Sequence, residues 1–123
     1  MSDPMHLRGD HLVDDTADHW AIERPSGSDF LAALTRLDAA RYTEVTITTA
    51  GDAHLAIAGG AGHYVVHATY GDSECWTLVR REPGTGGADP VVTLDQARTA
   101  GLTYLLTGTL DPTLRWERDG DRI

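Results

Sequence analysis

The stretch DPVVTLDQARTAGLTYLLTGTLDPTLRWER, residues 89–118, carries more structural signals than any other part of the chain. Thr93 and Gln96 have the spacing of a capping box, in which each side chain bonds the backbone of the other residue, so a helix is expected to begin there. Gly108 is suited to end that helix in the left-handed conformation. The segment 110–117, LDPTLRWE, then predicts a turn and a closing strand of alternating polarity.

Two amphipathic helices follow from the spacing of the apolar residues. The first is expected to begin near Ser28, whose hydroxyl can accept from free backbone N–H groups, and to run to about Arg41. Phe30, Leu34 and Leu37 lie at helical spacing within it. The apolar stripe of the second helix consists of Leu94, Ala97, Gly101, Tyr104 and Leu105. Each helix therefore has one face to bury against another element.

Between the two helices the apolar period changes from about 3.6 residues to 2, which is typical of strands. Four strands joined by short turns are expected over residues 42–49, 53–58, 63–70 and 73–80. A short strand over 19–23 and the closing strand complete the sheet. The expected fold is α+β: an antiparallel sheet of about five to six strands with two helices packed on one face.

The chain has 123 residues, enough for one domain with one hydrophobic core. Residues 1–123 are expected to form that domain, with 1–18 as a loose N-terminal arm because this polar segment has no periodic apolar pattern. The single cysteine, Cys75, leaves no partner for an internal disulfide. The N-terminus lacks a signal-peptide pattern and no stretch is apolar enough for a membrane helix, so a cytoplasmic location is expected.

The formal net charge is −9 at pH 7, with a sequence isoelectric point near 4.8. A surface of this kind repels phosphate backbones, so nucleic-acid binding is not expected. It attracts basic partners and accelerates their encounter by electrostatic steering. The negative charge therefore has two possible roles: it attracts a basic protein partner, or it only keeps the protein soluble.

The sequence predicts neither a metal site nor a catalytic set. His63 and His67 are separated by four strand rises of about 3.3 Å, which places them about 13 Å apart, too far to hold one zinc ion. Cys75 on a strand is interpreted as a small core residue. The glycine runs 59–62 and 84–87 lack the ending of a phosphate loop and are interpreted as a turn and a loop. A set of possible ligands near the N-terminus is interpreted as a solvated acidic arm: His6, Asp10, His11, Asp14, Asp15 and His19. No cofactor, metal or catalytic activity is therefore expected.

Aromatic and acidic side chains near the strand ends are the candidate partner-binding residues. Aromatic residues on a sheet most often fill a core, which is the preferred interpretation for Trp116 and Tyr70. Trp76 is balanced between core and surface, because Glu74 on the same face indicates partial solvation. The candidate set is Asp52, Tyr70, Asp72, Glu74, Trp76 and Glu117.

The run over residues 30–117 resembles the Imm1 family of bacterial immunity proteins in the order of its segments and in the kinds of residue that they contain. The helix FLAALTRLDAARY leads into the strand TEVTITT, followed by a glycine-marked hairpin, a tryptophan-containing strand and a GG loop. The stop at Thr107-Gly108 and the closing LDPTLRWE, residues 110–117, are the most specific part of the resemblance.

Membership would imply an antidote that binds the catalytic domain of a cognate polymorphic toxin, a nuclease or a deaminase, and occludes its active or substrate-binding surface. The acidic side chains would then bind to a basic toxin at the positions where the phosphates of its nucleic-acid substrate bind. Two other functions stay open: a small-ligand-binding α+β domain without catalytic activity, and an enzyme of unrecognised type. The enzyme is the weakest of the three, because no acid, base and nucleophile set stands out. A concave apolar pocket with convergent polar groups would favour ligand binding.

Overall fold

The computed structural model describes residues 5–13, 16–38, 40–49, 53–70, 74–81 and 88–118. Its elements in chain order are β1 (His6–Val13), β2 (Thr16–Glu23), α1 (Gly27–Arg36), β3 (Glu44–Thr48), β4 (His54–Gly60), β5 (His63–Tyr70), β6 (Glu74–Arg81), β7 (Ala88–Asp89), α2 (Leu94–Thr107) and β8 (Arg115–Arg118).

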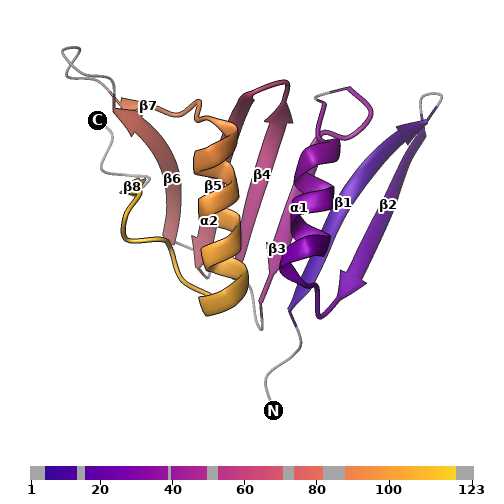
Figure 1. Cartoon of the computed structure of the whole chain (residues 1–123), viewed down its shortest axis with the longest axis horizontal. Helices are drawn as coiled ribbons and strands as arrows, with labels where there is room; N and C mark the ends of the chain where they lie inside the picture. The colour runs from indigo at the N-terminus through magenta and orange to yellow at the C-terminus, as the bar shows by residue number, and fades with distance from the viewer. Residues whose placement is uncertain are drawn as a thin grey trace.

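The strands form one antiparallel sheet, which Figure 1 shows with the two helices in front of it. Their spatial order is β2-β1-β3-β4-β5-β6-β7, and β8 also pairs with β6. The chain crosses through α1 from the edge strand β2 to β3, which pairs with the other side of β1. The prediction of an α+β fold with an antiparallel sheet is confirmed, with eight strands among the described residues instead of five to six.

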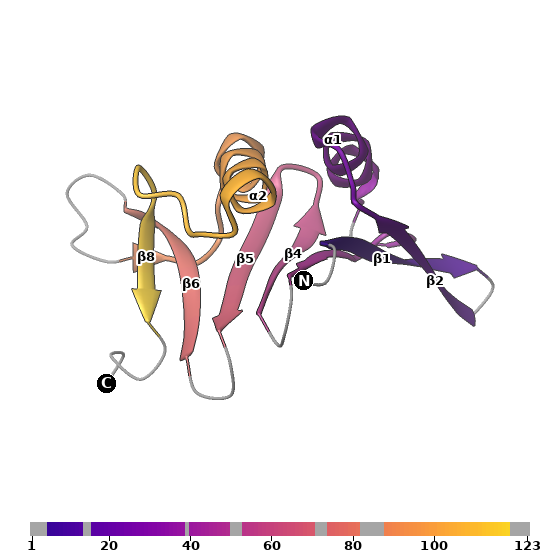
Figure 2. The same ribbon diagram turned by 90° about the horizontal axis from the view of Figure 1, so that it is seen from below.

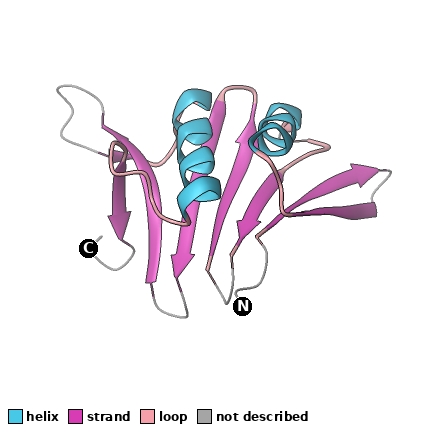
Figure 3. Cartoon of the chain, turned by 60° about the horizontal axis from the view of Figure 1, so that its bottom comes forward, coloured by secondary structure: helices cyan, strands magenta, loops and turns pink. Residues whose placement is uncertain are grey.

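Both helices lie on one face of the sheet, as Figures 2 and 3 show. Alternation along the strands directs the larger apolar side chains to this helix-covered face, as in the buried positions of β3 and β4. The strand side chains of the core include Val45, Ile47, Leu55, Ile57 and Val66, all at most 2% exposed. Burying one such side chain contributes about 1.5–3 kcal/mol, and the hydrophobic core lies on this face. In the described part of the chain no helix covers the other face, which is called the open face below.

The N-terminal segment is a strand hairpin, so the prediction of a loose arm over residues 1–18 is wrong for its described residues, 5–13 and 16–18. β1 lies between β2 and β3, and its Leu7 is fully buried. The next helix-side position is Gly9, and a Cβ added there would lie 2.4 Å from Cζ2 of Trp20. The Trp20 ring therefore fills the place of a side chain on β1, as aromatic residues do beside glycines in sheets. Because this ring comes from β2, the residues of β1 show no clear apolar alternation of their own.

The first helix begins earlier than expected. Its N-cap is Ser26, not Ser28: the Ser26 hydroxyl accepts from the Asp29 N–H at 3.1 Å. The Asp29 carboxylate in turn accepts from the Ser26 N–H at 2.8 Å, which completes a capping box. Asp29 also lies in the first turn of α1, where its negative charge suits the helix dipole.

The first helix also ends earlier, at Arg36 instead of about Arg41. The carboxylate of Asp38 accepts from the backbone N–H groups of residues 40, 41 and 42 at 2.8–3.0 Å, and these bonds turn the chain away from the helix. The same bonds, led by the one from Tyr42, lower the pKa of Asp38. Aspartate competes with helical hydrogen bonds in this way because its side chain is short.

The second helix follows the expected caps. Thr93 and Gln96 form the capping box, and Gly108 has the left-handed φ of 73°. The buried stripe consists of Ala97, Ala100, Gly101 and Tyr104. Leu94 lies on the flank of this stripe and is 41% exposed, so its assignment to the buried stripe is wrong.

Asp111 joins the second helix to the closing strand. Its carboxylate accepts from the Thr103 hydroxyl at 2.5 Å and from the Thr113 N–H at 2.8 Å. Its carbonyl accepts from Nε1 of Trp116 at 3.0 Å. Hydrogen bonds from Thr103, and then from Thr113, lower the pKa of this carboxyl. Trp116 packs partly buried against the core, which agrees with its predicted structural role.

Candidate functional site

The open face is organised in rows of side chains that run across the sheet. The strand register places one residue of each strand opposite its neighbour, with side chains on the same side. The central row, from the β2 edge to β8, consists of Ala21, Arg8, Thr46, Ala56, His67, Thr77 and Glu117. Most of these side chains are small or polar, and Arg8, Ala21 and His67 are exposed, whereas Thr77 is only 2% exposed. The accessible part of the row therefore lies over β1 to β5, with a guanidinium near its end.

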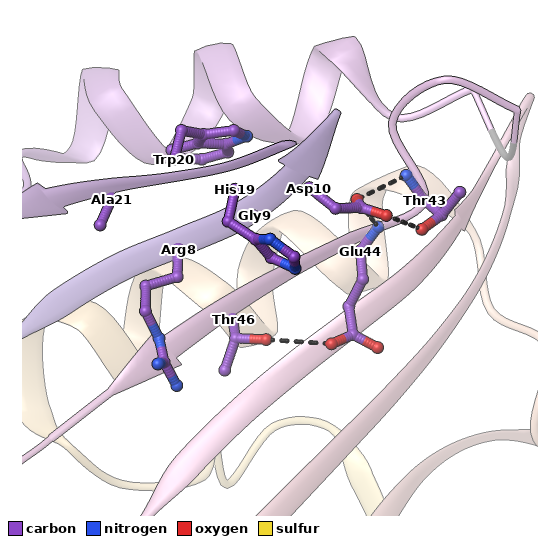
Figure 4. A pocket seen from close by; sticks show the side chains of 9 residues that line it. All are labelled: Arg8, Gly9, Asp10, His19, Trp20, Ala21, Thr43, Glu44 and Thr46. Atoms are coloured by element: carbon purple, nitrogen blue, oxygen red, sulfur yellow. Dashed lines mark hydrogen bonds between the residues drawn. The ribbon is translucent and has the colours of Figure 1, made fainter. Parts of the chain in front are cut away.

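A hollow of about 550 Å³ lies on this face over β1, β2 and β3 (Figure 4). It is lined by Arg8, Gly9, Asp10, His19, Trp20, Ala21, Thr43, Glu44 and Thr46. Figure 4 shows Arg8, His19 and Glu44 reaching toward the same space, with Trp20 on the other side of the sheet. The Thr46 hydroxyl donates to Oε1 of Glu44 at 3.2 Å, which orients that exposed carboxylate. The hollow therefore combines one guanidinium, one imidazole and one oriented carboxylate.

Asp10 gives one wall of the hollow its shape. Its carboxylate accepts from the Thr43 hydroxyl and, at 3.0 Å each, from the N–H groups of Thr43 and Glu44. Burial by itself would raise the pKa of Asp10, but these hydrogen bonds outweigh it and the pKa is lowered. The bonds tie β1 to the start of β3 and place Glu44 beside the hollow.

Replacing Asp10 by asparagine should lower the free energy of unfolding by about 1–2 kcal/mol, because an amide cannot accept all three bonds. The lowered folded-state pKa contributes stability above the ordinary carboxyl pKa of about 4, and this contribution is lost as the pH falls through the folded value. Urea denaturation from pH 7 down to about pH 3 should therefore show a shallower acid loss for Asp10→Asn than for the wild type. Asp95→Asn, which removes an exposed carboxylate on α2 outside the hollow and the hairpin, is the control and should leave the hydrogen bonds of Asp10, and the acid loss that they cause, in place.

The candidate residues on β6 and β8 fall on opposite faces of the sheet. Glu74 and Trp76 belong to the helix-covered face, where Trp76 packs partly buried against the core. Nε1 of Trp76 donates to Oε1 of Glu74 at 3.0 Å. Glu117 belongs to the open face, opposite Thr77.

The remaining candidate residues, Asp52, Asp72 and the side chain of Tyr70, lie outside the described residues. The partner-binding role of the whole set stays a prediction.

The histidines do not form a metal site in the part of the chain that the structure describes. His67 is on the open face and its Nδ1 lies 3.1 Å from the Thr77 hydroxyl. Strand alternation divides the N-terminal set: His6 and His19 are on the open face, whereas His11 stacks on Tyr42 with ring centroids 4.5 Å apart. Cys75 is partly buried, with its sulfur 3.8 Å from the Thr69 hydroxyl.

Arg8, His19 and Glu44 come together through the pairing of β1 with β2 and β3, which a loose arm over residues 1–18 would not provide. A signal was present: two eight-residue segments, 6–13 and 16–23, flank Asp14 and Asp15, a residue type that favours turns. A hairpin over those two segments places Arg8 on a strand.

Helices long and apolar enough to cross a membrane are absent from the described residues. Comparisons of the chain with protein-family models, with curated proteins and with solved structures found no match.

Proposed function

We propose that this chain is an immunity protein that binds and neutralises a cognate toxin domain, and that it acts by binding and not by catalysis. The observation that carries the proposal is the open face, a broad sheet surface that lies bare of helices in the described part of the chain. The resemblance of residues 30–117 to the Imm1 family supports the same function. A cytoplasmic location is part of the proposal.

The chemistry of the open face suits a basic partner. Among its described side chains, carboxylates outnumber guanidinium groups: Asp10, Glu23, Glu44 and Glu117 stand against Arg8 and Arg115. A projecting lysine or arginine of a toxin would meet the Glu44 carboxylate in the hollow. The overall charge of −9 would steer such a partner from a distance. In this arrangement the sheet would cover the surface with which the toxin binds its substrate.

The direct test uses the variable C-terminal domain of a toxin encoded beside this gene. The proposal expects a stable complex of the two purified proteins and loss of the toxin's activity when the complex forms. If the neighbouring domain neither binds the chain nor is inhibited by it, the proposal is wrong.

Glu44→Lys should weaken that complex by about tenfold or more, because it places a cation where the partner's basic group is expected. Asp95→Lys is the matched control: it makes the same change in net charge on α2, where Asp95 forms an exposed pair with Arg98 at 2.6 Å. Calorimetric titration of each variant with the toxin domain measures the affinity, and comparing the two variants separates a local contact at Glu44 from long-range electrostatic steering. Equal weakening by the two variants would show that the open face is not the binding surface.

The hollow supports a second candidate function, the binding of a small ligand. Arg8 and Glu44 could bind a carboxylate and an ammonium group of one molecule within about 550 Å³. A ligand-binding domain would gain thermal stability in the presence of free amino acids, and Arg8→Ala would remove that gain. An immunity protein would show the gain only with its toxin domain.

A further inference from the structure

The two edges of the sheet are built differently. At one edge the exposed strands are short: β7 has two residues and β8 has four. At the other edge β2 has eight residues, contains no proline or lysine, and pairs only with β1 among the described strands. Short edge strands, lysine and proline are the usual protections against edge-to-edge pairing. β2 has none of these three, and its carboxylates, Asp18 and Glu23, are the charges that a pairing strand has to neutralise.

The direction of the backbone groups on β2 follows from two hydrogen bonds. The Arg24 N–H donates to the Met5 carbonyl at 2.9 Å, so in the antiparallel ladder the even-numbered residues of β2 bond to β1. The Leu12 N–H donates to the Arg41 carbonyl at 2.7 Å, which shows the same alternation on the far side of β1. The odd-numbered residues of β2 therefore direct their N–H and C=O groups away from the sheet, and Ala21 is one of them.

We propose that β2 pairs with β2 of a second copy of this chain, antiparallel and with a two-fold axis at Ala21, so that two sheets join into one. In this register His19 lies opposite Glu23 of the other copy on the open face, and Trp20 lies opposite Ile22 on the helix-covered face. Asp18 lies opposite Arg24, which directly follows β2. Each copy therefore contributes both members of every pair, as a two-fold interface requires.

The neighbouring register lacks this complementarity. Moving the axis to Trp20 sets His19 opposite Ala21 and Asp18 opposite Ile22, so neither polar side chain meets a charged partner. Of these two registers, the one with its axis at Ala21 pairs charged with charged and apolar with apolar side chains.

A groove beside β2 extends the interface on the helix-covered face. It has a volume of about 610 Å³ and is lined by Ile22 of β2 and by Asp29, Leu31, Ala32, Thr35 and Arg36 of α1. A two-fold axis perpendicular to the sheet brings the grooves of the two copies side by side on one face. The apolar side chains Ile22 and Leu31 would then be covered by the second copy.

Ala21→Pro tests this pairing without breaking the sheet. The N–H that it removes points outward from β2, and proline is tolerated on edge strands for this reason. Sedimentation equilibrium of the whole purified chain, over a wide concentration range, should show a dimer for the wild type. Ala21→Pro should weaken it about tenfold to a hundredfold, since a central backbone hydrogen bond is lost in each direction. Ala21→Val, which keeps the N–H and favours strands, is the matched control and should still dimerise.

A charge exchange tests the register. Asp18→Arg alone and Arg24→Asp alone should each weaken the dimer by about threefold to tenfold at low salt, and the double variant should restore it. Circular dichroism of each variant verifies that the fold is retained. A chain that stays monomeric at the highest concentration, as expected if this edge takes a strand of another protein or none, overturns the proposal. A dimer that survives Ala21→Pro overturns it as well, because it would use another surface.

Discussion

Replacing Tyr104 by alanine should lower the free energy of unfolding by about 3–5 kcal/mol. Tyr104 is the largest fully buried side chain of the described residues, and it projects from α2 into the core. Its removal would leave a cavity between helix and sheet that the close-packed surroundings can fill only in part. Chemical denaturation of the variant and the wild type at neutral pH measures this loss.

Leu106→Ala is the control for Tyr104→Ala, because Leu106 is on the same helix but is 79% exposed. Its stability should stay within about 0.5 kcal/mol of the wild type. Tyr104→Phe keeps the ring and should retain most of the stability. Burial raises the pKa of Tyr104, with Thr49 offsetting part of the rise, so the wild type should lose stability as the pH rises above about 10. That alkaline loss should be smaller in Tyr104→Phe, and equal losses from Tyr104→Ala and Leu106→Ala would contradict the packing described above.

Gly101→Val should lower the free energy of unfolding by about 3 kcal/mol, at the upper end of the cost of overpacking a core. The two helices meet at Gly101, where an added Cβ would lie 2.0 Å from Cζ of the buried Phe30 ring. Gly101→Ala should also destabilise, although alanine in a helix is normally about 1 kcal/mol better than glycine. Thermal and urea denaturation of both variants test whether steric contact outweighs helix propensity.

Gly27→Ala is the matched control for the glycine variants. A Cβ at Gly27 would lie 3.6 Å from Leu102 Cδ2, an ordinary contact, so this variant should be neutral or slightly more stable. The effects of Gly101→Ala and Phe30→Leu on stability should also be coupled, because a smaller side chain at residue 30 makes room for the new methyl group. The combined loss should therefore be less than the sum of the two. Additive losses would mean that the Phe30 ring is not the obstacle.

The elements that were predicted correctly are those whose signals are local. The capping box of Thr93 and Gln96 and the stop at Gly108 depend on residues within one turn of each other, and the structure contains both. The central strands alternate because their side chains point in turn to the core and to the open face, so Val45 and Ile47 could be assigned to the core.

The errors lie where a contact of one side chain completes or interrupts the apolar pattern. β1 lacked a readable apolar alternation because the ring that covers Gly9 belongs to Trp20 on another strand. The end of α1 was misplaced because the Asp38 side chain competes for the backbone hydrogen bonds that would continue the helix. Neither effect follows from the period of the apolar residues.

By itself the sequence determined the α+β class, the central strands and the capped second helix, because capping and alternation act between near neighbours in the chain. The tertiary structure alone decided which strand lies at the edge and which side chains share the open face. Arg8, Glu44 and Glu117 come from separate strands, and only the register of the sheet places them on one surface. Register depends on pairing between distant segments, which is why the closing stretch 89–118 indicated the fold while the candidate site lay largely elsewhere, over β1, β2 and β3.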